Sequence, residues 1–218
     1  MGKITFTPIQ KLIFEEFSKF EPLRDKFYFS GGTALSVFYL HHRYSDDLDF
    51  FSENKPEDEI LTEFMTKISS LVKLKHRFTK IEETRIFEFV RKNKLIAKVD
   101  FSYYPYPRLK KGKVYKKVVV DSLRDIATNK LLAINQRNDV KDFVDLYFLL
   151  EKFTIWDLIY GVEAKFRRET DILLLGVDFM KVEEFDFLPR MIAPLKLSDL
   201  KKFFRKKALQ IASRVVEK

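Results

Sequence analysis

Hydrophobic positions in the N-terminal part of the chain change their period several times. They recur at helical spacing in three segments: residues 9–20, 33–42 and the stretch from Pro56 to Leu71, where Ile60, Phe64, Ile68 and Leu71 form the expected buried face. The short apolar runs 26–30 and 47–52 lie between these segments and are typical of strands. From Arg77 the period becomes two, which predicts strands over 78–81, 85–91, 95–103 and 114–120, with a turn at 92–94.

Beyond residue 120 the pattern becomes helical. Helices are predicted from residue 121 to 136, from 139 to 152 and from 199 to 216. The last helix has one apolar face, formed by Leu200, Phe204, Ala208, Ile211 and Val215. The sequence therefore predicts an α+β protein with an α/β-like core, in two domains of residues 1–120 and 121–218, the second helical.

Composition places the chain among folded globular proteins. Hydrophobic residues make up 46% of the 218 positions and include 23 Phe, which is far from the composition of a disordered chain. The absence of cysteine excludes disulfides, thiolate metal sites and cysteine nucleophiles. The first ten residues lack the apolar centre of a signal peptide, and no run of 18 apolar residues occurs, so we expect a cytoplasmic protein without a membrane partner.

The charge balance favours polyanionic partners. Lys and Arg number 41 against 32 Asp and Glu, a net charge of +9, which suits RNA, DNA or nucleotides, although a lysine-rich proteome would give the same balance. Arg108, Lys110, Lys111 and Lys113 form a basic loop close to Tyr104 and Tyr106. This loop is suited to stacking bases and holding phosphates, but an ordinary solvated loop would have the same composition.

Residues 30–51 carry the most specific chemistry. Asp47 and Asp49 lie two apart in a predicted strand, so they project from one face, while Leu48 and Phe50 pack in the core. Two such carboxylates repel each other unless a cation, such as a divalent metal ion, lies between them. The Gly31–Gly32 pair leads into a predicted helix, and a helix start reached through glycines is a natural phosphate site.

Two further features bear on this chemistry. Lys98 and Asp100 share the polar face of the strand 95–103, where Asp100 is a candidate third carboxylate for a metal cluster. His41 and His42, beside the aspartates, raise the alternative of a His/Asp metal phosphohydrolase. Consecutive residues on a helix do not face each other, however, so a helix end is the better interpretation of these histidines.

Together these motifs resemble the AbiEii/AbiGii-type nucleotidyltransferase toxins of the polymerase-β-like superfamily. The resemblance covers residues 27 to about 150 and is carried by five ordered motifs: Gly31-Gly32-Thr33-Ala34-Leu35; Arg43-x-Ser45-x-Asp47-Leu48-Asp49-Phe50; Lys98-Val99-Asp100-Phe101; the helix Asp125–Lys130; and Arg137 followed by Lys141-Asp142-Phe143-Val144-Asp145-Leu146. Lys141 stands where arginine is more usual, and the chain is shorter than many members.

The resemblance implies a minimal nucleotidyltransferase fold with a mixed β-sheet, followed by a helical subdomain. Asp47, Asp49 and Asp100 would bind Mg²⁺ or Mn²⁺, with Asp100 also the candidate general base. Phosphates of the NTP would lie at Gly31, Gly32 and Thr33, and Arg43 and Ser45 would either bind phosphate or order the turn before the strand. Lys130 and Asp142 would complete the site from the helical half, with Lys130 neutralising phosphate.

The residues leave alternatives for this helical half. Lys130 falls between Ile126 and Ile134, on or beside the inward face of its helix, although a lysine on an amphipathic helix is normally solvated. Asp142 and Asp145 would serve equally to charge the first turns of their helix.

The implied function is transfer of NMP from an NTP to an RNA such as tRNA, or to a protein acceptor, by the toxin of a toxin–antitoxin pair. An antitoxin protein is then an expected partner. The alternative is a catalytically silent member of the same fold that binds RNA or protein through its basic surface. The presence of Asp47, Asp49 and Asp100 together favours the enzyme.

Overall fold

The computed structural model describes residues 6–216, apart from the side chains of residues 214–216, so Val215 of the predicted apolar face lies outside the described side chains. The chain forms two compact units. Unit 1 contains the described residues up to His41 together with Ser45–Leu123, and unit 2 contains His42–Tyr44 together with the residues from Arg124 onwards. The short segment 42–44 therefore belongs with the C-terminal helices.

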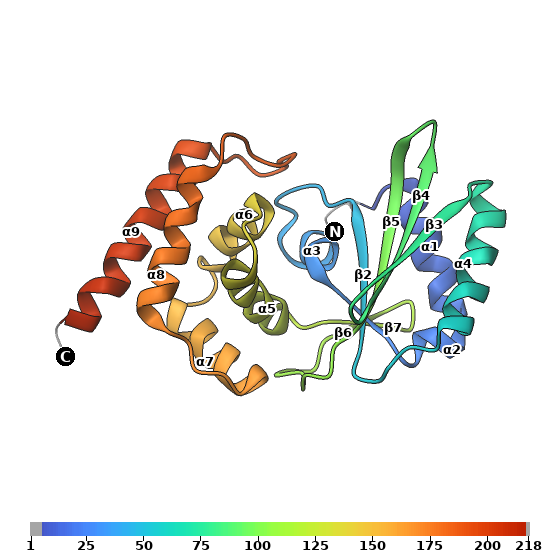
Figure 1. Cartoon of the computed structure of the whole chain (residues 1–218), viewed down its shortest axis with the longest axis horizontal. Coiled ribbons are helices and arrows are strands. Elements are labelled where there is room, and N and C mark those ends of the chain that lie inside the picture. The colour runs from blue at the N-terminus through green and yellow to red at the C-terminus, as the bar shows by residue number, and fades with distance from the viewer. Residues whose placement is uncertain (1–5, 217–218) are drawn as a thin grey trace. The chain divides into compact units, whose positions relative to one another are not determined.

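Unit 1 is built on a mixed sheet, as predicted. Within the described residues its seven strands lie in the order β3-β4-β5-β2-β1-β7-β6 (Figure 1). Their bounds are β1 Tyr28–Ser30, β2 Asp47–Ser52, β3 His76–Ile81, β4 Thr84–Arg91, β5 Lys94–Tyr103, β6 Lys113–Tyr115 and β7 Val118–Val120. The pairs β2–β5 and β1–β7 are parallel and the other pairs are antiparallel.

The predicted strand 114–120 is wrong, because it is two strands. Lys116 and Lys117 have φ values of +47° and +67° and form the turn of a hairpin between β6 and β7. The sequence does not indicate this turn, because valines lie on either side of it and lysine is not a typical residue for positive φ. The turn at 92–94 has the same character, and there the positive-φ residues Lys92 and Asn93 fall within the turn that the sequence predicts.

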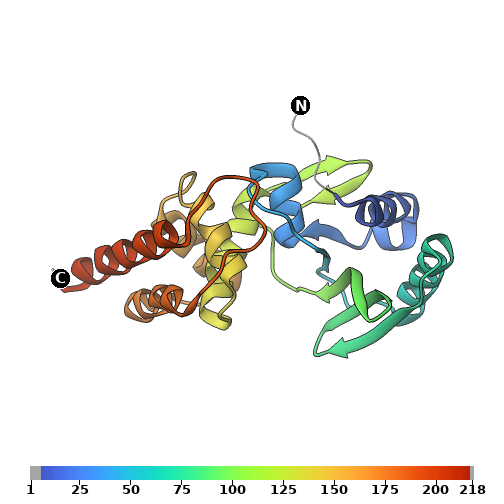
Figure 2. The same cartoon turned by 90° about the horizontal axis from the view of Figure 1, so that it is seen from above.

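Helices cover the sheet of unit 1 on both faces. They are α1 Pro8–Lys19, α2 Glu21–Arg24, α3 Gly31–Leu35, which continues as a π-helical turn over Ser36–Leu40, and α4 Asp58–Val72. In both cartoon views α1 and α4 lie on the same side of the sheet, whereas α3 lies on the other (Figures 1 and 2). The start of α1 is fixed by a capping box, in which Thr7 and Gln10 exchange backbone and side-chain hydrogen bonds.

The buried face of α4 differs slightly from the predicted one. Its buried residues are Leu61, Phe64, Met65 and Ile68. Ile60 is only partly buried, and Leu71 is 49% exposed, because it falls on the solvent side in the last turn before the helix ends. The predicted face is therefore confirmed at Phe64 and Ile68 and wrong at its two ends, and Leu61 and Met65 complete the buried face in place of Ile60 and Leu71.

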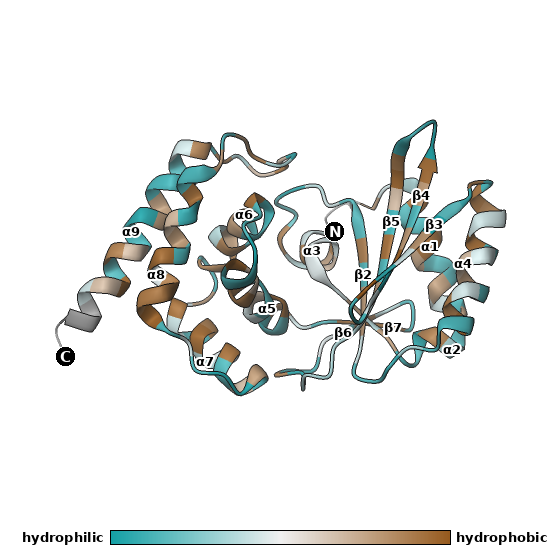
Figure 3. Ribbon diagram, viewed as in Figure 1, coloured by the Kyte–Doolittle hydropathy of each residue, from teal (hydrophilic) through white to brown (hydrophobic). Residues whose placement is uncertain are grey.

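Phenylalanine rings form the core between α1, α4 and the sheet. The Phe50 ring stacks on Phe17 with ring centroids 4.0 Å apart, and it lies 5.3 Å from both Phe29 and Phe101. Bands of hydrophobic and hydrophilic residues alternate along β5 in Figure 3, as expected for a strand with one buried face. Because these rings fill one face of β2 and β5, the polar side chains of both strands must project from the other.

Unit 2 consists of helices in its described part. They are α5 Leu123–Gln136, whose first residue still belongs to unit 1, α6 Val140–Leu149, α7 Ile155–Phe166, α8 Ile172–Met180, a 3₁₀ turn over Lys181–Glu184, and α9 Leu197–Val216. Phe143 packs edge-on against Phe185 and Phe204, with centroids 5.1 and 5.0 Å away. No helix in residues 6–216 is both long enough and apolar enough to cross a bilayer.

Candidate active site

The polar face of β2 presents Asp47 and Asp49 together. Burial alternates along the strand, so that Leu48 and Phe50 are fully buried while both aspartates remain partly exposed. This is the arrangement that the two-residue spacing predicts.

Strand pairing adds Asp100 to the same face. Strands β2 and β5 run parallel, with Asp49 paired to Asp100 and Asp47 paired to Lys98. Three carboxylates and one ammonium therefore lie in two adjacent rows of the sheet. Lys98 Nζ donates a hydrogen bond to Asp100 Oδ2 at 2.7 Å, and both side chains are largely buried. Lys98 is thus one cation that the chain itself supplies to these carboxylates.

Burial and neighbouring charges perturb the Lys98–Asp100 pair. Burial raises the pKa of Asp100 above the ordinary 3.8; Lys98 opposes this rise, while the negative charges of Asp47 and Glu88 add to it. Burial acts to lower the pKa of Lys98, but the hydrogen bond and the charge of Asp100, helped by Asp47 and Asp49, outweigh burial and raise it. Asp100 is therefore a better proton acceptor than an ordinary aspartate, and Lys98 stays protonated.

The donor set suits a hard divalent cation. Mg²⁺ and Mn²⁺ prefer carboxylate oxygens, which Asp47, Asp49 and Asp100 supply. In addition, Asp100 Oδ1 is buried and has no hydrogen-bond partner within residues 6–216, so one of its oxygens remains available as a ligand. The described residues contain no ready-made group of three acidic or imidazole side chains arranged around a metal position. The metal role of the three aspartates accordingly stays a prediction.

Gly31 brings the start of α3 against Asp49. Its φ is +72°, and a Cβ at this position would lie 2.0 Å from Asp49 Oδ2, so any other residue would be both strained and in collision. The glycine pair is not a turn before the helix, since α3 begins at Gly31 itself. Thr33 Oγ1 donates a hydrogen bond to the backbone oxygen of Asp47, which joins the helix to β2. Gly32 and Thr33 are buried.

A hydrogen bond that the sequence did not indicate holds Ser30, the residue before α3, in place. Asp121, at the end of β7, is fully buried, and its Oδ2 accepts a hydrogen bond of 2.8 Å from Ser30 Oγ. Ser45 contributes through its backbone oxygen, which accepts a hydrogen bond of 2.9 Å from Gln10 Nε2. The role of the Ser45 side chain in phosphate binding stays a prediction.

Unit 2 contains a separate buried ion cluster around Lys130. Lys130 Nζ lies 2.6 Å from Asp142 Oδ1 and 2.7 Å from Asp145 Oδ2. The Arg43 guanidinium binds Asp145 in a bidentate manner, through Nε at 2.6 Å and a terminal nitrogen at 2.7 Å. Asp142 lies in the first turn of α6, as the alternative interpretation expects, but both aspartates are completely buried and also form the ion pairs described above.

Two more side chains complete this cluster. His42 Nε2 lies 2.6 Å from Asp145 Oδ1, and Arg137 Nε donates to Asp142 Oδ2 at 2.6 Å. His42 is therefore a buried partner of a carboxylate, whereas His41 ends the preceding helix with φ of +52°. The contact of His42 with Asp145 and the place of His41 at a helix end agree with the interpretation of these histidines as a helix end.

The predicted residues thus fall into two groups. Unit 1 contains Gly31, Gly32, Thr33, Ser45, Asp47, Asp49 and Asp100, and unit 2 contains Arg43, Lys130 and Asp142. Arg43 is 1% exposed and bound to Asp145, which favours an ordering role for it over direct phosphate binding. The sequence did not indicate that Asp145 would pair with Lys130, Arg43 and His42. Its spacing of three residues from Asp142, on a helix with an apolar face, was the available signal.

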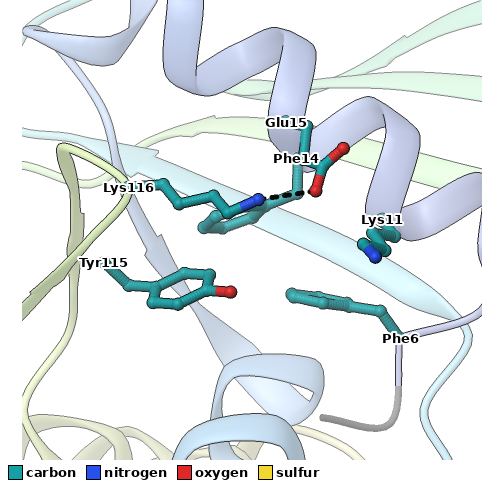
Figure 4. Close-up of a pocket in the computed structure, with 6 residues that line it drawn as sticks. All are labelled: Phe6, Lys11, Phe14, Glu15, Tyr115 and Lys116. Carbon is teal, nitrogen blue, oxygen red and sulfur yellow. Dashed lines mark hydrogen bonds and ion pairs between the residues drawn. The ribbon is translucent and has the colours of Figure 1, made fainter.

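A separate pocket of unit 1 contains none of these residues. It has a volume of about 170 Å³ and is lined by Phe6, Lys11, Phe14, Glu15, Tyr115 and Lys116 (Figure 4). An ion pair of 2.6 Å between Lys116 and Glu15 lies at this pocket. The pocket presents aromatic rings and no carboxylate cluster, so it is not the candidate site.

Comparison with known proteins decides the family. Residues 13–214 match the nucleotidyl transferase AbiEii toxin family of type IV toxin–antitoxin systems. The chain belongs to the AbiEii family. This confirms the resemblance carried by the five motifs and extends it almost to the end of the chain.

The individual proteins that this AbiEii protein resembles share a limited part of its sequence. An uncharacterized protein of Aquifex aeolicus is 36% identical over 137 residues, a match that spans 61% of each protein. Two solved structures share the fold. JHP933 from Helicobacter pylori has a TM-score of 0.58 and 19% identity, and the match covers 95% of this chain and 92% of that chain. The MenT4 nucleotidyltransferase toxin from Mycobacterium tuberculosis has a TM-score of 0.57 and 15% identity, and the match covers 94% of this chain and 84% of that chain. These likenesses confirm the predicted nucleotidyltransferase fold.

Substitution of Gly31 by alanine tests the contact with Asp49. We expect Gly31→Ala to lower the free energy of unfolding by about 2 kcal/mol or more, because the strained φ alone costs about 1–3 kcal/mol and the Cβ collides with the carboxylate. The measurement is urea denaturation. Gly176→Ala in α8 is the matched control, since its Cβ would meet nothing closer than 3.8 Å and the helix should gain up to about 1 kcal/mol. Equal stability of the two variants would contradict the described approach.

Acid titration tests the buried cluster of unit 2. Burial acts to raise the pKa of Asp145, but the charges of Lys130 and Arg43 outweigh it, so the folded pKa lies well below the ordinary 3.8. The stabilisation from Asp145 is therefore fully present above pH 3.8 and is lost as the pH falls through the lower, folded value. At pH 7, Asp145→Asn should cost about 3–5 kcal/mol, and the loss should shrink in acid. The exposed Asp186→Asn is the control, and a loss that does not change with pH would contradict the prediction.

Proposed function

We propose that this AbiEii protein is a metal-dependent nucleotidyltransferase, which moves NMP from an NTP to an acceptor and acts as the toxin of a toxin–antitoxin pair. The observation that carries the proposal is the register of β2 against β5. It sets Asp49 directly beside Asp100, with Asp47 on the same face, next to a helix start whose glycine admits the Asp49 carboxylate.

Each residue of unit 1 has a role in this proposal. Asp47, Asp49 and Asp100 would hold Mg²⁺ or Mn²⁺, which when bound supplies positive charge to the triphosphate and lowers the pKa of the attacking group. Backbone N–H groups at Gly31, Gly32 and Thr33 would orient phosphate oxygens. Asp100, whose pKa is raised mainly by burial, would accept the proton of the acceptor's hydroxyl.

Lys130 and Asp142 enter the proposal in a different way. Lys130 Nζ has two carboxylate partners within 2.7 Å inside unit 2, so its charge is already balanced there. We propose that these two residues act by fixing α5 to α6 rather than by binding phosphate directly. The loss of Lys130 would leave two buried carboxylates short of a counter-charge and would destabilise the unit.

An RNA such as tRNA is the acceptor that we favour. The net charge of +9 supports a polyanionic acceptor over a protein, and an antitoxin is the further partner that the description of the family suggests. A silent RNA- or protein-binding member of the fold is the second candidate. A silent member has no need of three paired carboxylates beside a close-packed glycine, and this disfavours it.

The experiment is a transfer assay with each labelled NTP, total RNA and the purified protein. Asp47→Asn, Asp49→Asn and Asp100→Asn should each reduce transfer at least about a hundredfold without unfolding the protein, because each change removes one carboxylate that the ion requires. The matched control is Asp46→Asn, since Asp46 is exposed and lies just before β2. It should retain nearly full activity.

Two results would overturn the proposal. Transfer at the wild-type rate by Asp49→Asn would remove the metal site from the mechanism. Absence of label on every RNA and protein, with the wild-type protein folded and supplied with Mg²⁺ or Mn²⁺, would favour the silent candidate instead.

A further inference from the structure

Aromatic residues continue the polar face of the sheet beyond the carboxylates. Phe51 lies two residues after Asp49 on β2, and Tyr28 lies two residues before Ser30 on β1. Strand pairing sets Ser30 opposite Asp49 and Tyr28 opposite Phe51, so these aromatic rings share the face of the carboxylates. The aromatic residues Tyr28 and Phe51 lie about 7 Å along the strands from Ser30 and Asp49.

The segment after β5 adds further rings and a guanidinium. The Tyr104 ring stacks on Phe51 with centroids 4.7 Å apart and planes inclined by 29°, and Tyr106 meets Tyr104 edge-on at 4.9 Å. The Arg108 guanidinium lies 4.9 Å from the centre of the Tyr28 ring. We call Tyr28, Phe51, Tyr104, Tyr106 and Arg108 the aromatic patch.

Part of the aromatic patch remains open to solvent. Phe51 and Tyr104 are only half-buried, and Tyr106 is 37% exposed. Arg108 forms one long ion pair, with Glu53 at 3.3 Å, in which both side chains are exposed. Such a pair contributes little free energy, so a phosphate can replace the carboxylate at low cost.

One polar atom of the aromatic patch is left without a partner. The Tyr28 side chain is buried, with 4% of the residue exposed, and no hydrogen bond to its hydroxyl is formed within the described residues. Burial of a hydroxyl without a hydrogen-bond partner lowers the stability of the folded protein. A bound group that hydrogen-bonds to this hydroxyl would recover that free energy, which is a reason to expect a ligand here.

We propose that the aromatic patch binds an unpaired segment of single-stranded RNA, whose bases stack on Tyr104 and Tyr106 and whose phosphate contacts Arg108. The inference rests on the proposed function, because it places the acceptor strand beside the carboxylates. Aromatic rings interleaved with basic side chains are the usual means of holding single strands. A strand accounts for the aromatic patch better than an NTP alone, since Lys110 and Lys111 follow Arg108 and extend the positive charge beyond one nucleotide.

The test is the affinity of a fluorescent single-stranded RNA octamer, measured by anisotropy without NTP. Tyr104→Ala should weaken binding about tenfold, from the loss of one stacked base, and Tyr104→Phe should bind within about twofold of wild type. Tyr106→Ala repeats the test at a more exposed position. The control is Tyr160→Ala on α7, because Tyr160 is 63% exposed and lies outside the aromatic patch. Arg108→Gln should reduce the salt slope by about 0.7.

The hydroxyl of Tyr28 gives an independent readout. Tyr28→Phe should weaken RNA binding several-fold while thermal stability holds or rises, because a buried unpartnered hydroxyl has been removed. An unchanged affinity together with a rise in stability would mean that no ligand reaches this atom, and would overturn its part in the proposal.

The remaining outcomes separate this proposal from the proposed function. If Asp49→Asn binds RNA normally but transfers no nucleotide, both the proposed function and the RNA site are supported. If Tyr104→Ala and Tyr106→Ala bind RNA as the wild-type protein does, the aromatic patch is not an RNA site, even where transfer is confirmed. A raised KM for NTP in Tyr104→Ala, with RNA affinity unchanged, would assign the aromatic patch to the base of the NTP instead. Equal affinity for an octamer of DNA would extend the site to single strands in general.

Discussion

Three carboxylates held on adjacent strands with one lysine among them are the arrangement on which the proposed chemistry depends. The phenylalanine core around Phe50 fixes which face of β2 and β5 is polar, and the parallel register then sets Asp49 beside Asp100. Burial is the main cause that raises the pKa of Asp100, and the charges of Asp47 and Glu88 add to it although Lys98 acts in the opposite direction. The same packing that folds the sheet therefore brings together the carboxylates to which the proposed function assigns the ion.

In unit 2 the buried carboxylates are paired with several cationic side chains. Asp142 and Asp145 are surrounded by Lys130, Arg43, Arg137 and His42, so each carboxylate has more than one partner. Charges from Lys130 depress the pKa of both aspartates despite their burial. Such a satisfied network favours a unique packing of α5 against α6 and of the segment 42–44 against α6. The buried carboxylates of unit 2 are thus paired with cationic side chains of the same unit.

Periodicity in the sequence predicted most strands, most helices and the shared face of Asp47 and Asp49, because these follow from local spacing, whereas the mixed sheet was expected from the resemblance. The register between β2 and β5 joins residues about fifty positions apart and cannot be obtained from spacing alone, although the resemblance brought Asp100 into the same site. Other features depend on tertiary contacts. The hairpin at Lys116 and Lys117 uses residues atypical for positive φ, and the burial of Asp145 depends on Arg43, a residue a hundred positions earlier.

The central claim is that Asp47, Asp49 and Asp100 form one cation site, and binding of Mn²⁺ measured by electron paramagnetic resonance tests it most directly, without any substrate. The account predicts saturable binding to the wild-type protein, which competes with Mg²⁺, persists in Asp46→Asn and is lost or greatly weakened in Asp49→Asn and Asp100→Asn. Mn²⁺ affinity that is the same in all four proteins would contradict it, since the ion would then be held elsewhere on the chain.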